Sequence, residues 1–122
     1  MEKRILIMDD DKTMREMIGI MLSKLDYEVD HAVNGEQAVE KYTAQPFNLV
    51  ILDLNIRGGD SGYETFQKLQ AYDPNIKAVV ISGHVQSPMV LKPRDFGFSG
   101  SLAKPFRMEA LQEVVRAALS DK

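Results

Sequence analysis

The sequence predicts an α/β domain in which helices cover both faces of a parallel β-sheet. Two observations lead to this prediction. Short β-rich runs alternate with segments of helical periodicity along the whole of the 122-residue chain. The central run Leu49-Val50-Ile51-Leu52 is apolar at every position, as expected for a strand that is covered on both sides. Strands that alternate with helices form parallel sheets, because a crossover helix then connects each strand to the next.

Five short segments have the composition of strands. Each is rich in β-branched or other apolar residues, and a segment with helical spacing follows it. The predicted strands span residues 4–8, 28–33, 49–54, 77–82 and, more weakly, 99–103.

Four segments between and after these strands have the spacing of helices. Apolar residues recur at i, i+3, i+4 and i+7 over residues 14–25, and the same pattern returns over residues 108–119. Shorter helices are expected around residues 38–42, after Asn34-Gly35, and around residues 63–69, after Gly62.

A fourth helix in chain order is expected between the fourth and fifth strands, but its sequence interrupts it. Pro88 fits the first turn of a helix, whereas Pro93 lacks a backbone N–H and would break an already short segment that ends at Gly97. We therefore expect this helix to be stiffened or fragmented.

The composition excludes several classes of function. The 15 basic and 18 acidic residues leave a formal charge of −3, which gives no electrostatic reason to approach nucleic acid or an anionic membrane. The absence of cysteine excludes disulfides, thiolate nucleophiles and thiolate metal sites. No apolar run approaches the roughly 18 residues of a membrane span, and the N-terminal run is too short for a signal peptide. We expect a single cytoplasmic domain over residues 1–122.

Acidic residues gather at one edge of the predicted sheet. Ligands of open parallel α/β sheets bind beyond the carboxyl ends of the strands. In the flavodoxin-like strand order 2-1-3-4-5, Asp9 and Asp10 after the first strand lie beside Asp53 at the end of the third. Such carboxylates repel one another unless a cation lies between them. Because Mg²⁺ prefers carboxylates together with waters and a phosphate oxygen, we predict a Mg²⁺ site, with Ser82 and Lys104 facing it from the fourth and fifth strands.

Each of these residues also has an ordinary structural interpretation. Asp10 and Asp11 could simply begin the first helix, and for Asp11 an N-cap is the preferred interpretation. Asp53 could be a satisfied loop acid and Lys104 a solvated surface lysine. The occurrence of all these groups at the ends of neighbouring strands favours the metal site.

Four short motifs, ILIMDDD, VILDL, VVISG and AKPF, occur in this order at the predicted strand ends. Through them the whole chain resembles the receiver domains of two-component response regulators. The resemblance implies that Asp9 and Asp10 hold Mg²⁺, with Asp53 and the backbone carbonyl of Asn55 as further ligands. It also implies that Asp53 is phosphorylated, because a carboxylate can attack phosphorus to give an acyl phosphate.

The same resemblance assigns roles to the remaining groups of the site. Ser82 would donate a hydrogen bond to the phosphoryl group and Lys104 would pair with its charge. The peptide between Lys104 and Pro105 is typically cis in this family. The phosphoryl donor would be a sensor histidine kinase or a histidine phosphotransfer protein, and the downstream partner would be a protein that the sequence does not identify.

The chain departs from the family pattern at several positions. Ser101 stands where many receivers have an aromatic residue coupled to the hydroxyl, so the usual hydroxyl–aromatic switch cannot operate. In the loop after Asp53, Arg57 replaces the common proline and Gly58-Gly59 lengthen the loop; similar GG loops occur in receivers attached to sensor histidine kinases. In the family, the positions of Asn55 and His84 influence hydrolysis of the acyl phosphate, although His84 has an alternative interpretation as an exposed loop histidine.

These features predict a phosphoacceptor switch that does not bind nucleic acid or a membrane through this domain. A receiver-like interaction module that works without phosphorylation is the alternative. An aspartate-nucleophile phosphatase is a weaker one, because Asn55 stands where that class has its second acid. The expected chemistry is self-modification and autodephosphorylation, so the chain is not predicted to be an enzyme.

Overall fold

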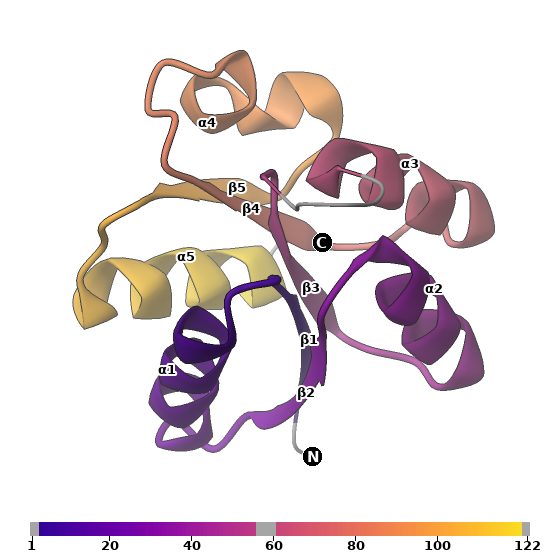
Figure 1. Cartoon of the computed structure of the whole chain (residues 1–122), viewed down its shortest axis with the longest axis horizontal. Coiled ribbons are helices and arrows are strands. Elements are labelled where there is room, and N and C mark those ends of the chain that lie inside the picture. The colour runs from indigo at the N-terminus through magenta and orange to yellow at the C-terminus, as the bar shows by residue number, and fades with distance from the viewer. Residues whose placement is uncertain (1–2, 56–60, 121–122) are drawn as a thin grey trace.

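The computed structural model describes residues 3–55 and 61–120. Its strands and helices alternate along the chain, and Figure 1 labels them in chain order. They are β1 (Arg4–Met8), α1 (Lys12–Ser23), β2 (Glu28–Ala32), α2 (Gly35–Ala44), β3 (Leu49–Asp53), α3 (Gly62–Tyr72), β4 (Ala78–Ser82), α4 (Pro88–Leu91), the 3₁₀ helix η1 (Pro93–Phe96), β5 (Gly100–Ala103) and α5 (Met108–Ser120).

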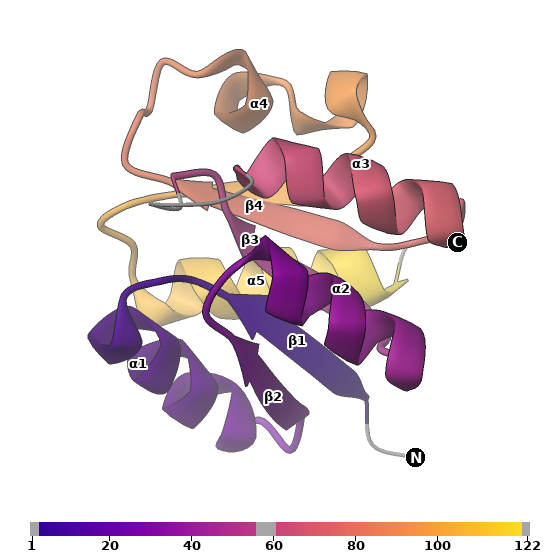
Figure 2. The same ribbon diagram turned by 45° about the vertical axis from the view of Figure 1, so that its right-hand side comes forward.

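The strands form one parallel sheet in the order β2-β1-β3-β4-β5, which confirms the predicted topology. Helices α1 and α5 lie on one face of the sheet, and α2, α3 and α4 lie on the other (Figure 1). Helices α2 and α3 are neighbours on their face, as Figure 2 shows from a second direction. The open sheet therefore carries helices on both faces, and the carboxyl ends of its strands form one edge.

Two apolar cores lie on the two faces of the sheet, because successive side chains of a strand point to opposite faces. Ile5 and Ile7 of β1 pack on the side of α1 and α5, whereas Leu6 and Met8 pack on the side of α2 and α3. All five residues of β3 are buried, as the unbroken apolar run predicts. Each fully buried aliphatic side chain contributes about 1.5–3 kcal/mol, so the two cores hold the sheet edge in place.

Polar caps fix where the helices begin. Asp11 is the N-cap of α1, and its carboxylate accepts hydrogen bonds from the backbone N–H groups of Thr13 and Met14, as the sequence predicts. Ser61 and Glu64 form a reciprocal capping box at the start of α3. Such caps satisfy backbone N–H groups that have no partner within the helix, and each contributes about 1 kcal/mol.

The predicted fragmentation of the fourth helix is confirmed. Helix α4 has only four residues, with Pro88 in its first turn, and η1 begins at Pro93. The segment ends at Gly97, whose φ of 93° is in the left-handed region that glycine adopts readily. The other predicted elements agree with the observed ones within a few residues. The GG loop prediction at Arg57 and Gly58-Gly59 falls outside the described residues.

Candidate functional site

A polar pocket opens at the carboxyl edge of the sheet, where β1, β3 and β5 end. Its walls include the three predicted acids and the predicted lysine, together with residues of the loops that follow β3 and β4. They are Asp9, Asp10, Asp53, Asn55, His84 and Lys104. The structure thus brings together, from four separate segments of the sequence, the acidic and basic groups that the strand ends predict.

Three carboxylates define the acidic side of this pocket. Asp9 and Asp53 are 1% and 3% exposed, whereas Asp10 is exposed. One carboxylate oxygen from each residue lies within 4.8 Å of those of the other two. Oxygens of three carboxylates so close together form the donor set that a hard divalent cation prefers.

The surroundings of Asp9 disfavour the charged form of its carboxylate. Burial raises the pKa of Asp9 from its ordinary 3.8 to about 6. The hydrogen bond from the backbone N–H of Asp11 opposes this shift, and the negative charge of Asp53 adds to it. The Oδ1 of Asp9 accepts the Asp11 N–H at 2.9 Å. Among the described residues its buried Oδ2 accepts no hydrogen bond, and it lies 3.5 Å from Lys104 Nζ as an ion pair. A buried acceptor oxygen of this kind fits a metal ligand.

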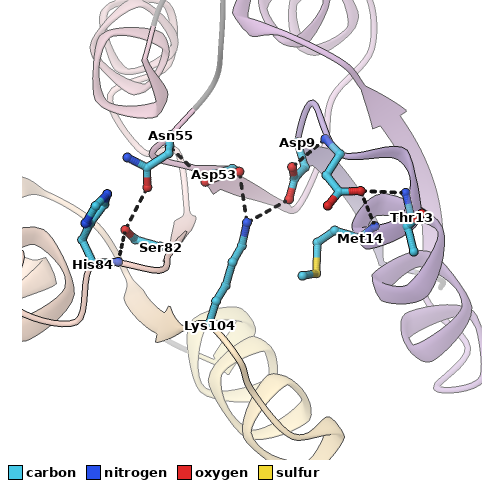
Figure 3. Close-up of polar contacts among 9 residues, drawn as sticks. Asp9, Thr13, Met14, Asp53, Asn55, Ser82, His84 and Lys104 are labelled. Atoms are coloured by element: carbon cyan, nitrogen blue, oxygen red, sulfur yellow. Dashed lines mark hydrogen bonds and ion pairs between the residues drawn. The ribbon is translucent and has the colours of Figure 1, made fainter.

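Lys104 is the cation of the site. Its Nζ lies 3.2 Å from Asp53 Oδ2 and 3.5 Å from Asp9 Oδ2, so the ammonium bridges the ends of β3 and β1 (Figure 3). Burial acts to lower the pKa of Lys104, but the charges of Asp53 and Asp9 outweigh it and the pKa is raised. The lysine is therefore positively charged at neutral pH. The peptide that joins it to Pro105 is cis, as the resemblance implies.

Asp53 ends β3 in a fixed orientation. Its Oδ2 faces Lys104, and its Oδ1 accepts a hydrogen bond from the backbone N–H of Asn55 at 3.0 Å. Gly62, at the start of α3, lies directly against this residue: a Cβ at Gly62 would be 2.3 Å from the backbone oxygen of Asp53. The position of the Asp53 carboxylate thus depends on the close approach of two backbone segments.

Ser82 joins the site through hydrogen bonds to the neighbouring loop. Its side chain is buried at the end of β4, and its Oγ donates to Asn55 Oδ1 at 3.0 Å. The backbone N–H of His84 donates to the same Oγ, also at 3.0 Å (Figure 3). The sequence predicts a role for the backbone carbonyl of Asn55 and for its position in the loop. It does not predict the bond from Ser82 to the Asn55 carboxamide, although a polar side chain two residues beyond Asp53 is a signal in that loop.

The two residues predicted to have modulating roles lie in different places. The exposed His84 is on the pocket wall, and its backbone rather than its ring contacts Ser82. Ser101 of β5 is half-buried, and its hydroxyl donates to the backbone oxygen of Val90 in α4 at 2.6 Å. This hydroxyl contacts α4, whereas the carboxylates that Lys104 pairs with are at the ends of β1 and β3.

The strand order β2-β1-β3-β4-β5, with an acidic pocket at the carboxyl ends of β1 and β3, defines a flavodoxin-like α/β domain with its candidate site at the topological switch point. A family model described as the response regulator receiver domain matches residues 5–116. The chain therefore belongs to the response regulator receiver domain family, and the resemblance noted from its motifs is confirmed.

Curated relatives of similar length agree with this assignment. The chain is 35% identical over 119 residues to the chemotaxis protein CheY of Thermotoga maritima, covering 93% of this chain and 98% of CheY. It is 29% identical over 119 residues to the sporulation initiation phosphotransferase F of Bacillus subtilis, covering 98% of this chain and 95% of that protein.

Solved structures show the same fold. A CheY-like response regulator receiver domain protein from Methanospirillum hungatei superimposes with a TM-score of 0.88 at 25% identity, over 98% of this chain and 94% of that one. NtrX from Brucella abortus gives a TM-score of 0.91 at 26% identity, and 98% of this chain covers 27% of that longer protein. Receiver domains are signalling domains rather than classical enzymes. Over the described residues, no helix has the length and apolar character of a membrane span.

Proposed function

We propose that the chain is a phosphoacceptor switch in which Asp53 accepts a phosphoryl group in a Mg²⁺-dependent reaction and thereby changes an interaction surface. The observation that carries this proposal is the pairing of Lys104 with both Asp53 and Asp9 in a pocket that holds a third carboxylate. Three ionised carboxylates and one ammonium have a net charge of −2, which a divalent cation would neutralise.

The phosphoryl donor is a phosphohistidine of a sensor histidine kinase or a histidine phosphotransfer protein. A carboxylate oxygen of Asp53 attacks the phosphorus atom, and the new O–P bond forms as the P–N bond breaks. The electron pair of the P–N bond returns to the imidazole, which takes up a proton. The product is an acyl phosphate on Asp53. Attack by water later releases phosphate and restores the carboxylate, which is the autodephosphorylation expected of a switch.

The residues of the pocket suit the metal that this reaction needs. Asp9, Asp10 and Asp53, with the backbone carbonyl of Asn55, would hold Mg²⁺. The buried Oδ2 of Asp9, which accepts no hydrogen bond from the described residues, supports this assignment. When bound, Mg²⁺ would neutralise charge on the transferred phosphoryl oxygens.

The basic and hydroxyl groups act on the phosphorylated form. Lys104 already faces the Asp53 carboxylate and would pair with the phosphoryl group, which adds about −1.5 to −2 charge. Ser82 would donate a hydrogen bond to a phosphoryl oxygen. We assign modulating roles to His84, on the pocket wall, and to Ser101, through its bond to α4. We further propose a cytoplasmic location, a single domain over residues 1–122, a downstream protein as the reader, and no contact with nucleic acid through this domain.

Intact-mass spectrometry tests the proposal. The protein is incubated with a small acyl phosphate donor, with and without Mg²⁺, as wild type, as Asp53→Asn and as Asp26→Asn. The last variant is the matched control, because Asp26 is exposed and its positive φ of 67° is one that asparagine tolerates. We expect one phosphoryl group in the wild type and the control only with Mg²⁺, and none in Asp53→Asn. Absence of any Mg²⁺-dependent gain, together with absence of Mg²⁺ binding, would favour the interaction module instead.

A further inference from the structure

The hydroxyl of Ser82 is already committed to a partner in the described structure. A serine hydroxyl has one proton to donate, and here Asn55 Oδ1 accepts it at 3.0 Å (Figure 3). The hydroxyl also accepts the N–H of His84, which fixes the oxygen from the other side. Ser82 cannot donate to a group on Asp53 until its bond to the carboxamide of Asn55 breaks.

Asn55 is hydrogen-bonded to Asp53, so phosphorylation of Asp53 would alter its surroundings directly. Its backbone N–H donates to Asp53 Oδ1 at 3.0 Å, while its side chain accepts from Ser82. One residue therefore links the end of β3 to the end of β4. A phosphoryl oxygen is a charged acceptor, and charge-assisted hydrogen bonds are about twice as strong as neutral ones. A phosphoryl group on Asp53 would therefore draw the Ser82 proton away from the neutral carboxamide.

A neighbouring hollow offers space for the carboxamide of Asn55 once its bond to Ser82 breaks. This hollow, of about 310 Å³, lies beside the site, and its walls include Asn55 and Ser82 together with Tyr63 of α3 and Met89 of α4. Ser101, in contrast, is bonded to the backbone oxygen of Val90. The polar contact that Ser82 gives up is thus on the loop that leads to α3.

We propose that Asn55 is a positioning residue whose side-chain carboxamide holds Ser82 in the unphosphorylated form and loses that hydrogen bond to the phosphoryl group on activation. This inference rests on the proposed phosphorylation of Asp53. It assigns to the Asn55 side chain a role separate from that of its backbone carbonyl. The exchange of acceptors replaces the missing aromatic residue as the first step of transmission, directed toward α3 and α4.

A double-mutant cycle tests the exchange. The affinity for beryllium fluoride, a tetrahedral analogue of a phosphoryl group, is measured by calorimetry with saturating Mg²⁺ for wild type, Asn55→Ala, Ser82→Ala and the double variant. Because Asn55 is exposed, water replaces part of its contribution, and we expect a coupling of about threefold, within the range of a neutral hydrogen bond. In the protein with Ser82, Asn55→Ala should raise the affinity for the analogue. The factor should be about threefold larger than the factor that Asn55→Ala produces in the Ser82→Ala background.

A second measurement needs no variant. The carboxamide resonances of Asn55 in the wild-type protein should shift when the analogue saturates the site. If Asn55→Ala changes the affinity by the same factor with Ser82 as with alanine at position 82, or if the carboxamide resonances do not move, the inference is overturned. Binding of the analogue by the wild type would still support the proposed function in that case. Failure of the wild type to bind the analogue although Mg²⁺ binds would overturn the proposed function, and the inference with it.

Discussion

The pH dependence of stability without metal is a direct consequence of the buried carboxylate of Asp9. Its pKa rises from 3.8 to about 6 on folding, chiefly because burial disfavours the charged form. The folded protein therefore holds a proton on Asp9 between these two pH values that the unfolded chain has lost. Stability must fall as pH rises through this window, because the unfolded state then binds fewer protons than the folded state.

The size of the effect follows from the same shift. One pKa unit corresponds to 1.36 kcal/mol, so the rise from 3.8 to about 6 corresponds to about 3 kcal/mol of stability lost in total as pH rises from well below 3.8 to well above 6. Asp9 is 1% exposed, so solvent screening reduces this figure little. Other groups act in the same pH range. Burial and the charge of Arg15 lower the pKa of His31. The contribution of His31 to stability therefore decreases as pH drops below about 6.5, which is opposite in sign to the effect of Asp9.

The comparison with Asp9→Asn isolates the carboxylate. Urea unfolding is measured from pH 4.5 to 7.5 in the presence of EDTA for both proteins, and the difference in unfolding free energy is plotted against pH. The variant lacks the titrating group but keeps a side chain of the same shape. We expect it to gain about 2 kcal/mol of stability relative to the wild type between pH 4.5 and pH 7.5, because part of the total effect occurs below pH 4.5.

Added Mg²⁺ supplies the control. A cation bound to the ionised carboxylate stabilises the folded wild type at neutral pH, so the difference between the two proteins should shrink or reverse. A difference that stays flat from pH 4.5 to 7.5 in EDTA would refute the reasoning, because it would show that folding does not bring Asp9 into an environment that favours the neutral acid.

Three further predictions concern other parts of the site. Lys104→Met should lower stability by about 1–3 kcal/mol in EDTA, because it leaves buried carboxylates without their counter-charge, and urea unfolding measures this loss. Gly62→Ala should lower stability by about 1–3 kcal/mol in thermal unfolding, since its Cβ would lie 2.3 Å from the Asp53 backbone oxygen. Gly83→Ala, whose Cβ meets nothing within 4 Å, should be nearly neutral, and equal effects of the two substitutions would contradict the close approach at Gly62. Ser101→Ala should cost about 1 kcal/mol and speed amide exchange in α4, because it removes the donor to the Val90 oxygen; unchanged exchange would show that this bond does not hold α4.

The convergence of Asp9, Asp53 and Lys104 could be predicted because topology alone determines it. Once strands and helices alternate, the carboxyl ends of parallel strands share one edge, and residues that follow the strands must lie there. The N-cap role of Asp11 was predictable for a local reason, since it depends on the chain over three residues.

The partners of Ser82 and Ser101 could not be predicted in the same way. The bond from Ser82 to Asn55 depends on the side-chain torsions of both residues, which the strand pattern does not fix. The bond from Ser101 runs from β5 to the backbone oxygen of Val90 in the four-residue helix α4. The sequence predicts the break in α4 but not which of its carbonyl groups a side chain of β5 contacts.

The bridge that Lys104 makes between β1 and β3 has a consequence for how the resting protein is maintained. The chain carries its own counter-ion at the acidic edge, attached to the strand on the far side of β4. Folding therefore does not have to wait for a metal from solution, as it does in domains that are unfolded without their ion. An incoming divalent cation would meet a cavity whose walls are already formed. Under the proposed function, signal reception would therefore rearrange contacts among groups that folding has already brought together, with no need to build a site.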